Sequence, residues 1–538
     1  MKKTLGKLLL LLLTLSMLAS CVSNGKTDGG VSTEEPQGSE VSLWMSHSYN
    51  KLMSNSKAPK DATNEYTLYM AKYESEGVQI ALRSSKDSEN FLKIRVLSGD
   101  NEHITYNMFH VKPILKKGRN TYTDPCAPIG QGSKFKLEKN TTMAILFDFT
   151  TTKDTPAGDY TYEIAIVDSK NTVYAQAKIT VHVWNFEMPV EHKFETACGN
   201  IAVGTPFCDS YLGDSYFQYD QMHYEMLLEH NLSGYVIPGN VLDDRSDKWM
   251  SDPRVTSFRL SYGANNFSLT EEQYEEMYNK LMSNPEWAKK AMFYPCDEPN
   301  SPERIQEFEE EYKYVLEHFP GIRTISPFYT NLQVTDEMDQ VDFMAQYINL
   351  HCPKFAMWND EYACTPEQVE KYGSFEDRMK ALQEKGDTVW TYVCNEPVAP
   401  YLNVHIDNDG LESRVLFWQF YQRDIDGFLY YGSTYWSEDP WHDVERYGVY
   451  GDGLLIYPGD ELGYNRFYPI PSIRLKIIRD GVDDIELMYI AEELLGREWV
   501  DSIVDQASSS ITSVDVTHDE FYDLRVALGN AVEAELNK

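Results

Sequence analysis

The apolar pattern of the chain changes near residue 190, and this change constrains the fold more than any other feature. Between residues 41 and 190, short runs of β-forming residues alternate with turn signals such as SGDN, PAGD and DSKN, and no helical period intervenes. This pattern predicts a β-sandwich domain over 41–190. After residue 190, strand-like runs alternate with helical patterns, which is typical of an α/β domain built on a parallel sheet.

The second region suits a (β/α)8 TIM-type barrel. Its strand-like runs and the helical patterns between them cover 191–495, and such barrels typically need about 250 residues. An open α/β sheet is the alternative. Helical periodicity continues to the end of the chain, so a C-terminal helical segment is expected over 496–538. The expected strands are residues 194–202, 232–238, 256–263, 291–299, 323–330, 341–349, 388–394 and 427–436.

The N-terminus has the pattern of a secretory signal. Three lysines among the first seven residues precede an apolar run, which the sequence LASC closes at Cys21. This pattern predicts a signal peptide over 1–21. It resembles a bacterial lipobox, in which Cys21 is lipidated; an ordinary signal peptide with a chance cysteine is the alternative. Residues 22–40 are rich in Gly, Ser, Thr and Glu and read as a flexible tether. We therefore expect a bacterial cell-envelope protein, periplasmic or outer-surface, that contacts the membrane only through its lipid anchor.

Charge and cysteine usage limit the classes of partner. The formal net charge of −36 opposes binding to nucleic acid or to anionic membrane surfaces. A neutral or cationic substrate fits better, and glycans are an obvious neutral class. The seven cysteines beyond Cys21 show no zinc-binding spacing, and neither a metal nor a cofactor motif is evident. Disulfides between Cys198 and Cys208, or between Cys352 and Cys364, are left open by the sequence.

The run AMFYPCDEPN, residues 291–300, places Asp297 and Glu298 side by side where the fourth expected strand ends. Barrel enzymes build their active sites at this end of the strands. A structural alternative is that the acids help to start the next helix, since negative charge is favourable at a helix N-terminus. However, Asn300 or Ser301 already supplies the helix cap, and both acids lie before it.

Neighbouring carboxylates suit one kind of glycosidic chemistry. A glycosidase needs a carboxylic acid with a raised pKa to protonate the leaving oxygen, and a second carboxylate usually acts from the other side of the sugar. Adjacent strand residues fit that two-sided arrangement poorly. They fit substrate-assisted cleavage better, in which a 2-acetamido group attacks its own anomeric carbon. One carboxylate then protonates the leaving group while its neighbour holds the acetamide nitrogen. We also expect two like charges so close together to separate their pKa values.

Several later segments, together with the DEP sequence, resemble glycoside hydrolase family 123. That family contains β-N-acetylgalactosaminidases and related domains of unassigned function, and the similarity runs from roughly residue 60 to 495. The resemblance implies that Asp297 orients the acetamide and that Glu298 is the general acid/base of a retaining hydrolase. The segments are WTYVC (390–394), RVLFW (414–418), DGFLYYGSTYW (426–436), GDGLLIYPG (451–459) and SIRLKIIRDGVDDIEL (472–487).

A rival assignment uses Glu396, which follows the seventh expected strand. Retaining glycosidases of the large barrel clan place the acid/base after strand four and the nucleophile after strand seven, positions that Glu298 and Glu396 would occupy. That clan usually has Asn-Glu where this chain has Asp-Glu, and Glu396 is equally explained as a solvated loop acid. Two further alternatives are a sugar substrate without an acetamide and a non-catalytic glycan-binding lipoprotein.

Aromatic residues near the expected strand ends are candidates for sugar binding, because sugar rings present apolar C–H faces and their hydroxyls need fixed partners. We expect the Tyr392 hydroxyl to donate to the acetamide oxygen and align it for attack. The sequence does not indicate the natural glycan, its linkage, exo or endo action, or the oligomeric state. The substrate-binding candidates are Tyr392, Trp436, Tyr435, Tyr347, Tyr329 and Asn395.

Overall fold

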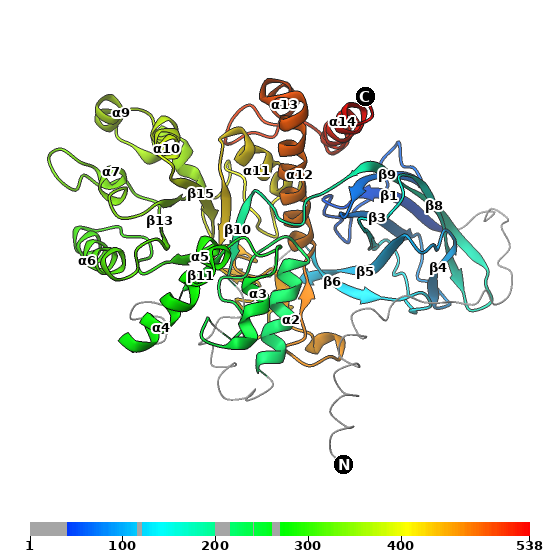
Figure 1. Cartoon of the computed structure of the whole chain (residues 1–538). Helices are drawn as coiled ribbons and strands as arrows, with labels where there is room; N and C mark the ends of the chain where they lie inside the picture. The colour runs from blue at the N-terminus through cyan, green and yellow to red at the C-terminus, as the bar shows by residue number, and fades with distance from the viewer. Residues whose placement is uncertain (1–39, 116–120, 200–215, 240, 261–269) are drawn as a thin grey trace, which may run out of the picture. The chain divides into compact units, whose positions relative to one another are not determined.

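The computed structural model describes residues 40–115, 121–199, 216–239, 241–260 and 270–538 (Figure 1). The expected signal peptide, its Cys21 and nearly all of the expected tether lie outside these residues. The chain divides into two compact units, one formed by residues up to Ile114 together with Thr121–Glu187, the other by Met188–Lys538 with the short stretch Leu115–Asn120. None of the described helices is long and apolar enough to cross a membrane.

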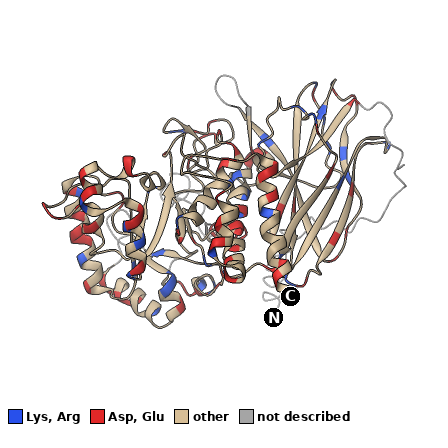
Figure 2. Cartoon of the chain, turned by 90° about the horizontal axis from the view of Figure 1, so that it is seen from above, with Lys and Arg blue, Asp and Glu red and all other residues tan. Residues whose placement is uncertain are grey.

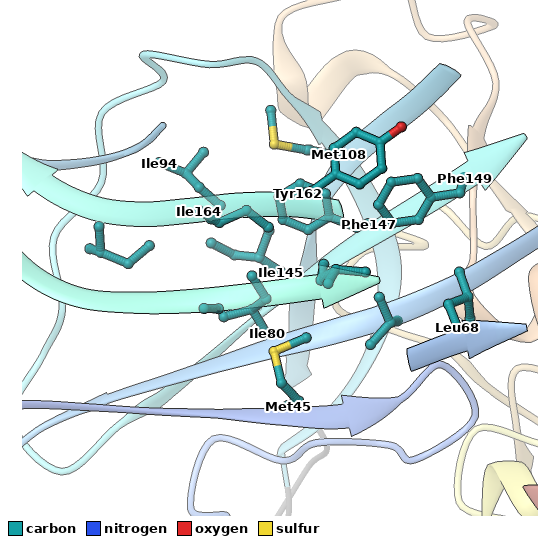
Figure 3. Packing of buried hydrophobic residues seen from close by; sticks show 14 of the residues in the cluster. Met45, Leu68, Ile80, Ile94, Met108, Ile145, Phe147, Phe149, Tyr162 and Ile164 are labelled. Carbon is teal, nitrogen blue, oxygen red and sulfur yellow. The ribbon is translucent and has the colours of Figure 1, made fainter. Parts of the chain in front are cut away.

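The N-terminal unit is rich in β-strands, as predicted. Its strands form two sheets whose apolar side chains share one hydrophobic core, with Ile80 and Ile145 from one sheet and Leu68 and Ile164 from the other (Figure 3). The first sheet has the order β1 (Val41–His47), β3 (Ser75–Ser84), β7 (Thr142–Thr151), β5 (Ile104–Leu115), β6 (Thr121–Ile129). The second has the order β2 (Glu65–Lys72), β9 (Val173–Glu187), β8 (Gly158–Asp168), β4 (Leu92–Ser98).

The second unit is built on a parallel sheet that closes into a barrel-like ring. Backbone hydrogen bonds join its two edge strands through residues 233–235. Cys198 N donates to Ser233 O at 2.7 Å, Tyr235 N donates to Cys198 O at 2.8 Å, and Arg259 N donates to Tyr235 O at 2.6 Å. The strands follow the order β10 (Glu195–Cys198), β16 (Gly427–Tyr430), β15 (Thr388–Val393), β14 (Leu350–Pro353), β13 (Arg323–Phe328), β12 (Ala291–Phe293), β11 (Phe258–Leu260).

Two of the expected strands differ from the structure. The strand predicted at 341–349 is wrong, because this stretch begins with helix α7 (Gln340–Met344) and the strand follows it as β14. Asp339 caps that helix by accepting from Asp342 N, and a short apolar run such as this one does not distinguish a buried helix from a strand. Residues 232–238 form no regular strand and contribute only the backbone bonds of 233–235 and a bridge between Gly234 and Cys198.

Helices separate most of the strands, and Figure 1 shows them around the barrel-like sheet. The helix after β12 begins as expected, with Ser301 as its cap and Pro302 in its first turn. The helices between β10 and β15 are α2 (Tyr216–Leu228), α3 (Asp247–Met250), α4 (Glu271–Met282), α5 (Pro285–Lys290), α6 (Pro302–His318), α7, α8 (Asp360–Ala363), α9 (Pro366–Tyr372) and α10 (Phe375–Glu384). The later ones are α11 (Gly410–Gln422), α12 (Ile473–Leu495), α13 (Arg497–Val504) and α14 (His518–Leu536).

Buried ion pairs connect three of the later helices. Arg414 on α11 donates from Nε to Asp484 Oδ2 on α12 at 2.8 Å, and Arg525 on α14 donates to Asp484 Oδ1 at 2.8 Å. These three side chains are almost completely buried. Opposite charges buried together neutralise each other, so this network holds helices together and is a structural use of charge. Figure 2 shows that acidic residues also line the outer surfaces of helices in this unit.

Candidate active site

The two adjacent carboxylates lie just beyond β12, at the carboxyl end of the parallel sheet. Glu298 has a left-handed backbone with φ of +46°, and its N–H donates to Pro327 O of β13 at 3.2 Å. The side-chain alternation of an extended strand therefore does not apply at this residue. Burial raises the pKa of the Cys352 thiol on β14, and Asp297 and Glu298 both add to that rise. The charges of both carboxylates therefore act on one interior residue of the barrel.

Glu298 has the environment of a general acid. Its side chain is half-buried, and the Tyr392 hydroxyl on β15 donates a hydrogen bond to Oε1. Burial raises the pKa of Glu298; the hydrogen bond from Tyr392 opposes this rise and the charge of Asp297 adds to it. The net effect is a pKa above the ordinary value, which favours the protonated carboxyl that a general acid needs.

Asp297 has a different environment, because it is exposed to solvent. The Tyr294 hydroxyl donates to Asp297 Oδ1 at 2.5 Å. Tyr294 is itself held by Arg259, whose guanidinium lies 4.4 Å from the ring centroid. Arg304 donates to the backbone oxygen of Asp297 at 3.1 Å and so fixes the turn that carries both acids. The carboxylate is therefore oriented, yet open to a ligand.

Lys354 is a buried cation beside the pair. It pairs with Tyr392 through a parallel β-bridge, and its Nζ lies 2.8 Å from Oε2 of Glu396. Its Nζ also lies 4.4 Å from the ring centroid of Tyr329. The charge of Lys354 lowers the pKa of Glu298, whereas that of Glu396 raises it. Glu396 is thus an ion-paired neighbour of the acid.

The structure brings several predicted binding residues to this end of the sheet. Tyr392 contacts Glu298 directly, and Tyr329 accepts a hydrogen bond from Asn300 Nδ2 at 2.7 Å. Asn395 lies two residues after the end of β15 and is half-buried. These positions agree with a polar lining around the carboxylate pair, formed by side chains at the ends of neighbouring strands.

Three other predicted residues contact groups other than the pair. Tyr435 follows β16 and is 39% exposed. The Trp436 indole donates to Ile456 O at 2.8 Å and packs near His223. Tyr347 precedes β14 and lies at the amino end of the sheet, where its hydroxyl donates to Glu309 at 2.9 Å. Its selection for the site followed from the misplaced strand, so the structure does not bring Tyr347 to the carboxylates.

Lys354 and Tyr294 were missed from the sequence. Lys354 directly follows the true β14, so correct placement of that strand would have indicated it. Tyr294 stands three residues before Asp297 in the stretch that carries the acids. Asp452 is buried in the loop after β16, and burial raises its pKa; Tyr431 donates to it at 2.8 Å.

Glycine is required in the Asp452 loop. Gly453 has φ of +69°, and a Cβ atom there would lie 2.6 Å from the hydroxyl oxygen of Tyr431. A side chain at this position would therefore displace the tyrosine that binds Asp452.

The amino end of the barrel-like sheet holds a cavity of about 560 Å³, lined mostly by charged residues. There Arg323 donates two hydrogen bonds to the carboxylate of Glu195, at 2.9 and 2.6 Å. Lys290 donates to the backbone oxygen of Asp252 at 2.8 Å. These contacts hold charged side chains of the cavity in place, and barrel enzymes build their active sites at the other end of the sheet. We therefore assign the site to the carboxylate pair.

Within the described ranges, no group of three or more His, Cys, Asp or Glu side chains is arranged to hold a metal ion. Cys352 and Cys364 are free thiols, so the disulfide left open between them is not formed; Cys208 lies outside the described residues.

Residues 251–491 match the glycoside hydrolase 123 catalytic domain. This match confirms the resemblance read from the sequence, and it contains both carboxylates. A family 123 glycoside hydrolase from Clostridium perfringens, described for its hydrolysis of glycolipid glycans, has a similar structure. The TM-score is 0.63 at 13% identity, covering 92% of this chain and 98% of the other. At that identity the likeness establishes the fold, a β-rich unit followed by a barrel-like α/β unit.

Two further solved structures match with lower TM-scores. Bacteroides uniformis β-glucuronidase 3 matches with a TM-score of 0.27 at 10% identity, covering 77% of this chain and 50% of that one. An endo-β-1,4-mannanase from Thermotoga petrophila matches with a TM-score of 0.23 at 14% identity, covering 40% of this chain and 50% of that one. No curated protein sequence matches the chain.

Proposed function

We propose that this protein is a retaining glycoside hydrolase that removes β-linked N-acetylgalactosamine, or another N-acetylhexosamine, from glycans by substrate-assisted catalysis. The observation that carries this proposal is the contrast within the pair. Glu298 is half-buried with a raised pKa and a hydrogen bond from Tyr392, whereas Asp297 is exposed and oriented by Tyr294. Two carboxylates with different environments suit two different roles.

In the first step, the acetamide oxygen of the bound sugar attacks the anomeric carbon. A bond forms between these two atoms while the bond from the anomeric carbon to the leaving oxygen breaks, and Glu298 gives its proton to that oxygen. Asp297 accepts a hydrogen bond from the acetamide N–H and stabilises the positive charge that develops on the resulting oxazolinium ring. No protein atom becomes bonded to the sugar.

In the second step, the Glu298 carboxylate takes a proton from a water molecule as the water oxygen attacks the anomeric carbon. The bond to the acetamide oxygen breaks, and the sugar leaves with its original configuration. Two inversions at one carbon give retention. The same residue thus serves as acid and then as base, which requires a pKa close to the working pH.

The tyrosines fix the carboxylates for these roles. The sequence suggested that Tyr392 aligns the acetamide oxygen, but its hydroxyl is bonded to Glu298. We therefore propose that Tyr392 positions the acid and that Tyr294 positions Asp297. Tyr329 and Asn395, at the ends of β13 and β15, are proposed to contact the sugar hydroxyls.

The substrate class follows from charge and from the similar structure. A chain with a net charge of −36 favours a neutral glycan, and the Clostridium perfringens hydrolase acts on glycolipid glycans. We propose that glycans of this kind are substrates, reached from the cell envelope by a protein anchored through lipidated Cys21. We also propose that the β-rich unit is a β-sandwich and that the α/β unit is a complete TIM-type barrel.

One specific observation supports a second candidate, a two-carboxylate mechanism with Glu396 as nucleophile. The Oε2 atom of Glu396 lies 2.8 Å from Lys354 Nζ, and the charge of Glu396 acts on Glu298. In that mechanism Glu396 itself would form a bond to the anomeric carbon, and the substrate would need no acetamide.

Nitrophenyl glycosides of β-N-acetylgalactosamine, β-N-acetylglucosamine, β-galactose and β-glucose separate these candidates when assayed with the wild type, D297N, E298Q and E396Q. Our proposal predicts cleavage of acetamido sugars alone, deep losses in D297N and E298Q, and inhibition by a thiazoline analogue. Cleavage of plain galactoside with an equally deep loss in E396Q would favour the second mechanism. Binding of glycans without any cleavage would indicate a non-catalytic glycan-binding protein.

A further inference from the structure

A β-hairpin that follows β16 in the chain presents an exposed tyrosine in an unfavourable conformation. The hairpin consists of β17 (Glu445–Arg446) and β18 (Val449–Tyr450). Tyr447 at its turn has φ of +50° and is 70% exposed. Bulky side chains rarely adopt left-handed backbone conformations, which Asn and Gly accept readily. A residue that is both strained and exposed is a candidate for a binding role.

Arg446 lies between two tyrosine rings. Its guanidinium carbon is 3.2 Å from the ring centroid of Tyr435 and 5.0 Å from that of Tyr447. The Arg446 Nη2 donates to the Tyr447 hydroxyl at a long 3.4 Å. Among the described residues, Arg446 Nε is buried without a hydrogen-bond partner. A guanidinium has five N–H donors, so this one has donors to offer a ligand.

Backbone contacts place this hairpin at the carboxyl end of the sheet. Ile406, in the loop after β15, donates its N–H to Tyr450 O at 2.9 Å. Tyr435, after β16, donates its N–H to Gly453 O at 2.9 Å. The hairpin is therefore held by the loops that follow two neighbouring strands, β15 and β16, and β15 carries Tyr392.

Ring and hydrogen-bond contacts continue from the hairpin toward the interior. The Tyr435 ring lies 5.8 Å from the ring of Tyr431, whose hydroxyl donates to Asp452 at 2.8 Å. Burial raises the pKa of the Cys394 thiol, and Asp452 and Glu298 both add to that rise. The charges of Asp452 and of the proposed acid thus both act on Cys394, which follows β15 and whose backbone oxygen accepts a hydrogen bond from His405 Nε2 at 2.8 Å.

We propose that Tyr435, Arg446 and Tyr447 form a second sugar-binding subsite, which holds the sugar on the leaving-group side of the bond that is cleaved. This inference rests on the proposed function and extends it to a preference for oligosaccharides over simple glycosides. The exposed Tyr447 ring offers an apolar face to the C–H face of a sugar, and Arg446 offers N–H donors to its hydroxyl oxygens or to an acidic substituent.

The variant Tyr447→Asn tests the subsite, because it removes the ring and suits the left-handed backbone. The variant and the wild type are assayed on methyl β-N-acetylgalactosaminide and on disaccharides in which N-acetylgalactosamine is β-1,3- or β-1,4-linked to a hexose. Released N-acetylgalactosamine is measured for each substrate. We expect the loss in kcat/KM to be about ten-fold larger for the preferred disaccharide than for the methyl glycoside, because removal of one aromatic contact residue typically weakens binding by about this factor. The melting temperature should not fall.

Tyr73→Asn is the matched control. Tyr73 is also an exposed tyrosine, with φ of +58° and Lys153 Nζ at 5.6 Å from its ring centroid, but it lies in the N-terminal unit. We expect this control to affect both substrates equally. Tyr447→Phe should cleave the disaccharides as efficiently as the wild type, because the ring face is retained. A disaccharide that carries a carboxylate or sulfate on its hexose shows which acceptor Arg446 prefers. If the acceptor is acidic, Arg446→Met should lose more kcat/KM on that disaccharide than on the neutral one.

Equal losses on both substrates in Tyr447→Asn, or no loss on either, would overturn the subsite. A wild-type protein that cleaves the methyl glycoside and the disaccharides equally well would also overturn it, although the proposed function would stand. A wild-type protein inactive on every substrate would overturn the proposed function itself.

Discussion

The two ends of the parallel sheet use charged residues in opposite ways. At the amino end, the Glu195 carboxylate receives two hydrogen bonds from Arg323 and a third from the Trp390 indole at 3.1 Å. At the carboxyl end, Asp297 and Glu298 receive hydrogen bonds from neutral tyrosine hydroxyls. The Glu195 carboxylate is thus held by a cation, whereas the pair is held by neutral donors, and burial together with the charge of Asp297 raises the pKa of Glu298.

The buried network of Arg414, Asp484 and Arg525 resembles the amino end of the sheet, because its carboxylate is also held by cations. Asp484 is fully buried between two guanidiniums, and its role is to join helices. Asp484 and Asp297 therefore differ in both burial and partner, because Asp297 is exposed and receives its hydrogen bond from a neutral tyrosine hydroxyl.

The largest expected effect is on catalysis at the carboxyl end. Glu298→Gln removes the transferable proton and should lower kcat/KM by about 10³- to 10⁴-fold, near the top of the range for general acid–base groups. Asp297→Asn keeps the size of the side chain, removes its charge, and should cost about 10²- to 10³-fold. Steady-state kinetics on a β-N-acetylgalactosaminide measure both. A loss below ten-fold in either variant would mean that the pair is not the catalytic centre.

The corresponding change at the amino end should affect stability instead. Glu195→Gln leaves Arg323 without its carboxylate in a largely buried position and should reduce the free energy of unfolding by about 2–3 kcal/mol. Urea denaturation measures this loss. The kcat of the folded variant should equal that of the wild type, and a reduced kcat would show that the two ends are not separate in function.

A smaller effect is expected for Glu396→Gln, which removes the partner of Lys354. The charge of Glu396 raises the pKa of Glu298, so its loss lowers that pKa. The alkaline limb of the kcat/KM profile, where the acid loses its proton, should therefore move to lower pH, with less than about a ten-fold loss at the optimum. The second mechanism would instead produce a loss as deep as that of Glu298→Gln.

How much of this contrast could be predicted from the sequence depends on the kind of signal. The change from β-rich to α/β pattern and the Asp297–Glu298 pair were visible, because periodicity and a carboxylate pair at a strand end are local features. Lys354 was hidden by the two possible readings of the apolar run at 341–349. The subsite of Arg446 and Tyr447 depends on a left-handed turn and on loop packing, which residue types do not reveal.

The smallest expected effect is on stability near the acid. Because the pKa of Glu298 in the folded protein is raised above its ordinary value of 4.5, its contribution to stability is present below that value and is lost as the pH rises through the raised pKa. Glu298→Gln should therefore melt at a higher temperature than the wild type at pH 8, with the difference vanishing near pH 4. Thermal denaturation across that range measures it, and a variant less stable at pH 8 would argue against a raised pKa.

The chemical identity of the nucleophile can be measured directly with a series of aryl β-N-acetylgalactosaminides whose acetyl groups carry zero, one, two or three fluorine atoms. Fluorine withdraws electrons from the acetamide oxygen, so kcat/KM should fall steeply with each added atom if that oxygen attacks the anomeric carbon. Rates that hardly change across the series, accompanied by a covalent sugar on Glu396, would contradict a division of labour between Asp297 and Glu298 over the substrate's own amide.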